Sequence, residues 1–419
     1  MTSHSDSDLP LAEVLINTLL DELGDVPASL AVAGEMALLD FVGCARGGAA
    51  REARSLPTAE SAESLAGALG ILCSALDRDD LHLLSLTHPG SVVWPGVIAL
   101  GIETEATGHE LLRAAILGYE VVGRLGRALG PDHRRLWHTT GTAGTVGAAT
   151  AAAHVLRLDA AATVSAVGHA TSVAAGSSQC LLEGSATRLL HRAAAACNGI
   201  LAARCAAAGL DATRFGFEGE RGLFAATSSV DRAAEVLVAG ESWVIEEVVQ
   251  RYYASNGFSH AAIEAAHELA AEIRPPFASV QIELPKLALS AAASNSPVTP
   301  HEAWWSAPYA VCVTVLYGSD KLEDITLLKD DAVRRLLRRT SVSPSADDSS
   351  SVTINRRTCT KLVYRGHPQA PLSFHDLLTK CRTLDPDFNL DCETIGVSED
   401  QRGVASTVRD LVFGATSRV

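Results

Sequence analysis

The chain has no excess of basic residues, few aromatic residues and no closely spaced cysteine pair. Of its 419 residues, 34 are Lys or Arg and 49 are Asp or Glu, which gives a formal net charge of −15. A protein that binds nucleic acid needs a basic face to neutralise phosphates, so we expect neither a nucleic acid nor a membrane surface as partner. With 47% hydrophobic and only 20% charged residues, the chain is expected to fold compactly into about two to three domains.

The nine cysteines form no recognisable framework. They are odd in number, scattered from Cys44 to Cys392 and never spaced as CxxC, which favours reduced thiols in a cytoplasmic protein. The first residues, MTSHSDSDLP, have neither the basic nor the apolar part of a secretion signal. The weakly charged run over 85–102 contains His88, two prolines and three glycines, so we expect no membrane span there.

The first 260 or so residues have the pattern of packed helices. Alanine-rich stretches have the highest helix propensity, and the 5% of aromatic residues suits close packing of helix on helix. In residues 109–125, apolar side chains recur at three- and four-residue steps, as on a helix with one buried stripe. Similar patterns cover residues 9–23, 28–45, 59–76 and 189–208.

The pattern changes after Ile273. The Pro275–Pro276 pair interrupts the helix, and apolar residues then alternate with polar ones over 280–284, as in a half-buried strand. A second pair of strands is predicted within 351–366, after the polar segment 343–350. Further helices are predicted over 310–316, 326–338, 373–382 and 399–413.

These patterns predict a mainly α fold with two domains. The first is a large all-helical domain over residues 1–265, completed by about 393–419. The second is a smaller α+β domain over 266–392.

The first polar cluster lies in LDRDDLHLLSLTHPG, where Asp77, Asp79, Asp80, His82 and His88 fall within twelve positions. Carboxylates beside imidazole rings orient a histidine and suit it to proton transfer near neutral pH. A polar loop between helices accounts for the same residues equally well. A zinc site has little support, because no two histidines lie four residues apart with an acid between them, so no metal is expected.

The second cluster is RRLWHTTGTAGTVGAATAAA. A helix that begins near Thr139 would place His138 at its N-terminal end, where free N–H groups attract anions and lower the pKa of a histidine. Gly141, Gly144 and Gly147 match neither GxGxxG nor GxxxxGK[ST], so tight helix crossing is the better interpretation of their spacing.

Two further segments, ATRLLHRAAAACNG and VVQRYYASNGFSH, each carry an arginine near a helix start or turn. Arg188 beside His191, and Arg251 near Asn256, could hold a carboxylate through two parallel hydrogen bonds. Solvated surface arginines are the more common case. Tyr309, in WWSAPYAVC, would ordinarily be a core or interface residue.

The order and spacing of these segments, together with FEGERGLF and PLSFHDLLTKC, resemble the MmgE/PrpD family over nearly the whole chain. This family includes 2-methylcitrate dehydratase, cis-aconitate decarboxylase and iminodisuccinate epimerase. The resemblance implies a helical domain with a smaller α+β lid, a homodimer, and an active site in the cleft between the domains. It also implies chemistry without a cofactor.

Carried over by position, His88 matches the histidine that acts as acid or base at a substrate carbon. The resemblance likewise implies catalytic roles for Asp77, Asp80, His138 and Tyr309. The expected substrate-binding residues are Arg188, His191, Arg251 and Asn256.

Several positions depart from the family pattern. Arg188 and Arg251 stand where the family has lysines, and because arginine stays protonated they can bind an anion but not exchange a proton. Leu81 removes a hydroxyl that many members have, while Ala193 and Asn256 also alter the expected pocket wall. A substrate with fewer carboxylates than a tricarboxylate, or a bulkier one, is therefore expected.

The sequence thus favours a cofactor-independent lyase or isomerase that moves a proton on a carboxylate-bearing small molecule. Dehydration, decarboxylation and epimerisation all use the same proton-handling groups. Two alternatives remain open at this point: a specialised-metabolism cyclase or isomerase acting on a larger intermediate, and a non-catalytic binding protein.

Overall fold

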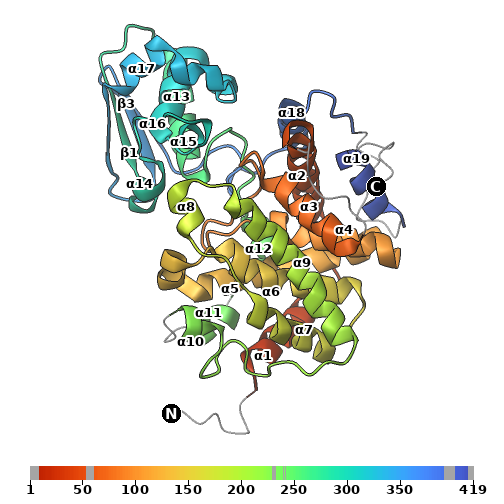
Figure 1. Ribbon diagram of the computed structural model, residues 1–419. Helices are drawn as coiled ribbons and strands as arrows, with labels where there is room; N and C mark the ends of the chain where they lie inside the picture. Colours follow the sequence, from red (N-terminus) through yellow and green to blue (C-terminus); the bar gives the residue numbers. More distant parts are fainter. Residues whose placement is uncertain are drawn as a thin grey trace. The chain divides into compact units, whose positions relative to one another are not determined.

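The computed structural model describes residues 9–52, 61–228, 233–238, 240, 242–390 and 402–413. The chain divides into two compact units. Unit 1 is Met1–Val248 together with Phe374–Val419, and unit 2 is Val249–Ser373. As predicted, the fold is mainly α, with a helical unit and a smaller α+β unit (Figure 1).

Unit 1 consists of helices connected by loops, the longer of which include the one over residues 75–89. Its helices with described bounds are α1 (Leu11–Leu23), α2 (Ala28–Glu52), α3 (Ala62–Ser74), α4 (Gly90–Thr104), α5 (Gly108–Leu136), α6 (Thr139–Val155), α7 (Ala160–Val173), α8 (Gln179–Glu183), α9 (Thr187–Ala207), α10 (Leu223–Thr227), α11 (Ala233–Val238), α12 (Val244–Glu247), α18 (Phe374–Leu384) and α19 (Val404–Phe413).

Helix α6 lies at the centre of unit 1, packed against α4, α5, α7 and α9. Its side chains are mostly Gly, Ala and Thr, and nearly all of them are buried. A Cβ added to Gly147 would lie 2.6 Å from the carbonyl oxygen of Gly118 on α5, so only glycine permits this close approach. A Cβ at Gly144 would lie 3.0 Å from the Val92 side chain of α4. Gly144 and Gly147 therefore serve helix crossing, as predicted, whereas a Cβ at Gly141 would lie 2.5 Å from the carbonyl oxygen of Ala175, in the loop after α7.

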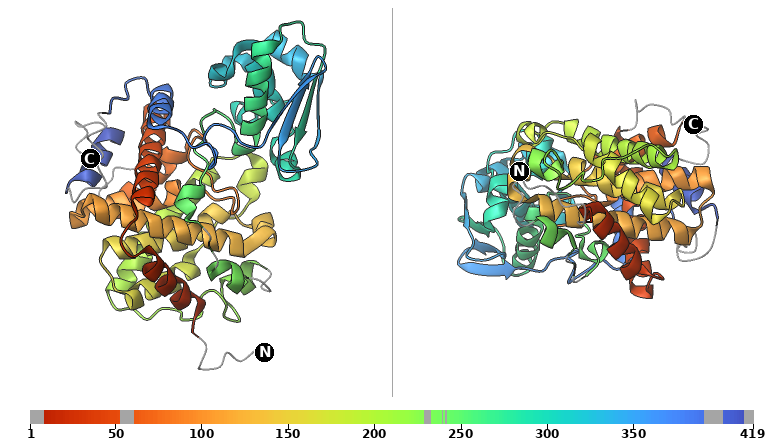
Figure 2. Two further views of the ribbon diagram at one scale, coloured as in Figure 1. Left: turned by 180° about the vertical axis from the view of Figure 1, so that it is seen from behind. Right: turned by 90° about the horizontal axis from the view of Figure 1, so that it is seen from below.

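Helix α18 returns from the far end of the sequence to pack against α2, and Figure 2 shows the two side by side. On α18 the buried residues Leu377, Lys380, Cys381 and Leu384 form one stripe. By length and composition α2 could cross a membrane, but 61% of its apolar window is buried, which is also the pattern of a core helix.

Unit 2 is built on a four-stranded sheet with the strand order β2-β1-β3-β4. The strands are β1 (Val280–Leu284), β2 (Thr340–Pro344), β3 (Ser350–Ile354) and β4 (Arg357–Lys361). β1 pairs with β2 in parallel and with β3 antiparallel, and β3 pairs with β4 antiparallel. α13 (His260–Glu272) and α16 (Ala307–Tyr317) pack together on the sheet (Figure 1). Smaller helices α14 (Lys286–Ala292), α15 (Pro300–Trp304) and α17 (Asp331–Leu337) complete the unit.

The division between the units differs from the expected boundaries at 265/266 and 392/393. It falls at 248/249 because α13, whose sequence has the same apolar periodicity as the helices before it, packs on strands β3 and β4. It falls at 373/374 because α18 packs on α2. Strand β2 was not predicted; its last two residues belong to the segment that we expected to be a polar linker.

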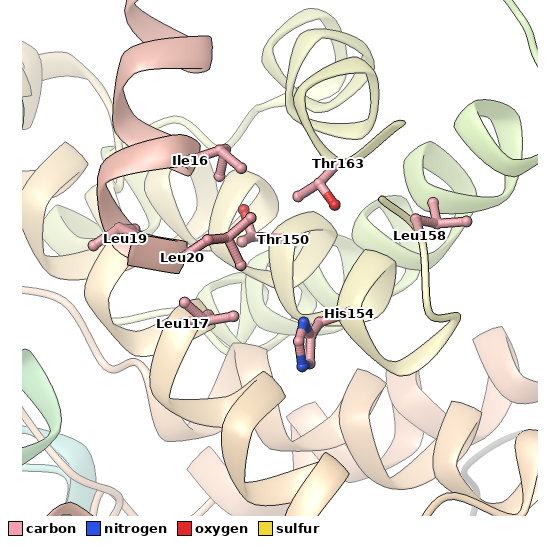
Figure 3. Close-up of a pocket in the computed structure, with 8 residues that line it drawn as sticks. All are labelled: Ile16, Leu19, Leu20, Leu117, Thr150, His154, Leu158 and Thr163. Carbon is pink, nitrogen blue, oxygen red and sulfur yellow. The ribbon is translucent and has the colours of Figure 1, made fainter. Parts of the chain in front are cut away.

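A small cavity of about 20 Å³ lies where α1, α5, α6 and α7 meet (Figure 3). Its walls combine leucines with Thr150, Thr163 and His154, and it has room for about one water molecule. It lies along the C-terminal half of α6, whereas His138 immediately precedes that helix. Burial lowers the pKa of His154 to about 4, with a further contribution from Arg113.

We expect His154 to make the stability of unit 1 depend on pH. Its pKa lies below the unfolded value of 6.5, so the unfolded chain takes up a proton first as the pH falls. The loss should be about 2 kcal/mol between pH 7 and pH 5. Urea unfolding of His154→Gln at both pH values should lack this part of the loss. The exposed His375→Gln is the control, and equal pH dependence in both variants would contradict the prediction.

Candidate active site

The loop between α3 and α4 carries the first polar cluster. Asp77 and Leu86 adopt positive φ angles of 54° and 51°, and a bridge between His82 and Thr87 closes the loop. Asp80 accepts hydrogen bonds from the N–H of Gly90, the first residue of α4, at 3.0 and 3.2 Å. A Cβ at position 90 would lie within 3.0 Å of the Asp80 carboxylate, so glycine is required for this contact. The loop is therefore held in one conformation at the start of α4.

Burial raises the pKa of Asp80 to about 7. The Tyr119 hydroxyl lowers it, the nearby carboxylates of Asp40 and Asp79 raise it further, and the Gly90 N–H lowers it. A carboxyl group with this pKa exchanges a proton near neutral pH, which is unusual for aspartate. Its contact with Gly90 also makes Asp80 a structural support for the start of α4.

His88 is held through one ring nitrogen. Its Nδ1 lies 2.6 Å from the main-chain oxygen of Asp80 and 3.4 Å from Oδ2 of Asp79. Because a carbonyl oxygen can only accept, Nδ1 carries the proton and Nε2 of the neutral ring has the lone pair. The His88 side chain is 16% exposed, and its main-chain N–H donates to the Thr140 hydroxyl of α6 at 3.3 Å.

His138 and His191 form a second imidazole group. Their Nδ1 atoms lie 3.0 Å apart, so one ring donates its Nδ1 proton to the other. Burial, followed by the charge of Arg192, lowers the pKa of both rings, and that of His138 strongly. The pair is therefore neutral near pH 7 and presents one Nε2 lone pair and one Nε2 proton. His138 precedes α6 directly, as predicted.

Two buried arginines lie on the first turns of α9. Arg188 donates from Nη2 to Asp77 at 2.9 Å, while its buried Nε has no hydrogen-bond partner among the described residues. Arg192 donates from Nε to the Ser91 hydroxyl at 3.2 Å and lies 3.6 Å from Asp79. Asp77 and Arg188, two predicted site residues whose pairing was not predicted, thus form a buried ion pair. The Nε of Arg188 is therefore a buried donor that the described residues leave without an acceptor.

One buried ion pair that contacts the loop between α3 and α4 was not predicted from the sequence. Lys380 of α18 donates to Asp40 of α2 at 2.5 Å and to the main-chain oxygen of Arg78 at 2.7 Å. Both side chains are almost fully buried. The available signal was a lysine within the apolar stripe of an amphipathic helix, where only a paired charge is tolerated.

His82 lies in the same loop between α3 and α4, but its ring is hydrogen-bonded to other residues than those around His88. Its Nδ1 lies 2.7 Å from the Ser85 hydroxyl and its Nε2 lies 2.9 Å from Glu247 of α12. His82 and Ser85 are fully buried. This network anchors the loop to α12 and engages the buried hydroxyl of Ser85.

Within unit 1, six predicted site residues gather where α4, α6 and α9 begin: His88, His138, Asp77, Asp80, Arg188 and His191. Helix N-termini attract negative charge, and here three of them are connected by hydrogen bonds near buried arginines. The arrangement combines groups that take up or release a proton with groups that bind an anion.

The other three predicted site residues belong to unit 2. Arg251 is buried. Asn256 receives a hydrogen bond from Ser259, and its buried amide nitrogen has no hydrogen-bond partner among the described residues. Tyr309 is buried on α16, where burial raises its pKa to about 12 and its hydroxyl is likewise without a described partner. Their roles toward a substrate stay predictions.

Comparison with known proteins identifies the family. Residues 52–235 match the MmgE/PrpD N-terminal domain and residues 253–389 match the MmgE/PrpD C-terminal domain. The chain therefore belongs to the MmgE/PrpD family.

Two curated relatives are similar over most of the chain. One is the cis-aconitate decarboxylase-like protein oryM of Aspergillus oryzae, 28% identical over 312 residues. That match covers 66% of this chain and 64% of the relative, so the chain spans less than two thirds of its length. The other is human cis-aconitate decarboxylase, 26% identical over 348 residues, covering 75% of this chain and 70% of the relative.

Proposed function

We propose that the protein is a cofactor-independent lyase or isomerase that moves a proton at the carbon next to a carboxylate of a small organic acid. One observation carries this proposal: His88 and the His138–His191 pair lie at the same helix N-termini as Arg188, whose Nε is buried without a described partner. The names of the two relatives support a lyase.

In this scheme the substrate carboxylate binds to Nε of Arg188, whose orientation is fixed by Asp77. Removal of the adjacent proton leaves negative charge that spreads into the carboxylate, where the guanidinium and the helix N-termini stabilise it. Nε2 of His88 is the atom that accepts or returns the proton, because Nδ1 is occupied by its contact with Asp80. From this intermediate, departure of a β-hydroxyl group as water gives elimination, and return of the proton to the opposite face gives inversion. Decarboxylation reaches a similar carbanion by loss of carbon dioxide, and His88 then delivers a proton to that carbon.

The test is proton exchange in deuterated water with a panel of mono-, di- and tricarboxylic acids, cis-aconitate among them. We expect at least one acid to exchange its α-proton or to form product, followed by ¹H NMR. Because Arg188 stands where the family has lysine, we expect mono- or dicarboxylates to react faster than tricarboxylates. Acids that bind, as detected by calorimetry, but neither exchange nor react would contradict the proposal and favour a binding protein.

A further inference from the structure

Asp79, which was not among the predicted site residues, lies between a histidine and an arginine. A single carboxylate oxygen, Oδ2, is 3.4 Å from Nδ1 of His88 and 3.6 Å from Nε of Arg192. The Asp79 side chain is 1% exposed and that of Arg192 2% exposed. The His88 ring and the Arg192 guanidinium therefore both lie near the same buried carboxylate oxygen of Asp79.

The position of Asp79 is fixed by hydrogen bonds of its two chain neighbours. The peptide that joins Arg78 to Asp79 is fixed by the hydrogen bond from Lys380 to the Arg78 carbonyl. On the other side, the Asp80 carboxylate is bound to the start of α4. Asp79 is thus held between two fixed peptides, and its carboxylate is a stable part of the surroundings of His88.

The consequences for His88 follow from electrostatics. When Nε2 takes up a proton, the ring becomes positive, and the Asp79 carboxylate stabilises that charge at close range. Arg192 opposes it, because it attracts the same oxygen and repels the ring. Charged or titratable groups near this position include Asp80 and Arg78 of the loop, Tyr119 of α5, Arg188 of α9, His138 before α6, and the Asp40–Lys380 pair.

We propose that Asp79 favours the charged form of His88, whose ring is oriented by the Asp80 carbonyl, while Arg192 limits that effect by attracting the same Asp79 oxygen. This inference rests on the proposed function for its catalytic meaning. The geometry of the ring and its protonation can nevertheless be measured without any substrate.

The experiment is ¹⁵N NMR of the full chain labelled at histidine, with the His88 signals identified by their loss in His88→Gln. In the wild-type chain we expect the neutral ring of His88 to be protonated at Nδ1. In Asp79→Asn the midpoint of its titration should move to lower pH by about one unit or more, and in Arg192→Gln it should move to higher pH. The exposed Asp21→Asn is the matched control.

An unchanged midpoint in Arg192→Gln would overturn the proposal even if Asp79→Asn does not fold. So would an unchanged midpoint in a folded Asp79→Asn. If the proposed function is correct, the pH profile of α-proton exchange should move with the NMR midpoint. If no acid exchanges its proton, the proposed function fails while the NMR result still decides the role of Asp79.

Discussion

Replacing His88 by glutamine is expected to lower the rate of α-proton exchange by about 10²- to 10⁴-fold, the usual contribution of a general acid or base. Glutamine can keep a hydrogen bond to the Asp80 carbonyl, so the loop should retain its conformation. It has no group that takes up a proton near neutral pH, so the chemical step should be lost. Substrate binding should change little, because the anion is bound by Arg188.

The rate and the binding constant should be measured together, by exchange in deuterated water and by calorimetry. His109→Gln is the matched control, because His109 is an exposed histidine on α5. A loss of binding equal to the loss of rate would show that His88 only holds the substrate. An exchange rate within about threefold of the wild type would exclude His88 as the acid or base.

Replacing Lys380 by methionine is expected to destabilise the protein by about 3–5 kcal/mol, the usual cost of removing one partner of a buried ion pair. Burial already raises the pKa of Asp40, and Lys380 lowers it. Without the lysine, Asp40 must remain buried as an uncompensated charge or take up a proton. The Arg78 carbonyl also loses its donor. Urea unfolding at pH 7 measures the change.

A double variant separates the effect of Lys380 on stability from its effect on activity, and Lys321→Met is the control. The double variant Asp40→Leu with Lys380→Met removes both charges and should recover most of the lost stability. The rate of α-proton exchange should be low in both Lys380→Met and the double variant, because neither has a donor that fixes the peptide between Arg78 and Asp79. Lys321→Met, which removes an exposed partner of Asp320, should change stability by less than about 0.5 kcal/mol. A stable and fully active double variant would contradict the role given to Lys380.

Much of the fold could be predicted because the apolar periodicity is strong. The helix beginning after His138 and the strand over 280–284 lie where the sequence placed them. β2 was missed because a five-residue strand with mostly exposed side chains has little alternation to detect. The end of the helical unit at Val248 was missed because periodicity identifies a helix but not the element against which its apolar face packs.

Some residues of the candidate site could likewise be predicted from the sequence, and others could not. Residues in dense local clusters, such as Asp77 and His88, could be chosen from the sequence. Lys380 and Asp40 are 340 positions apart, and only the folded chain brings them together. Asp79 could be noticed in its cluster, but its selection required knowing that its oxygen lies between His88 and Arg192.

The path of the chain through unit 1 has a consequence for biosynthesis. Unit 2 is inserted between Val248 and Phe374, so a ribosome must produce all of it before α18 can reach α2. Until then, the α2 surface that α18 will cover is open to chaperones and to other nascent chains. We therefore expect the helical unit to become resistant to protease only after residue 384 has left the exit tunnel, late in translation.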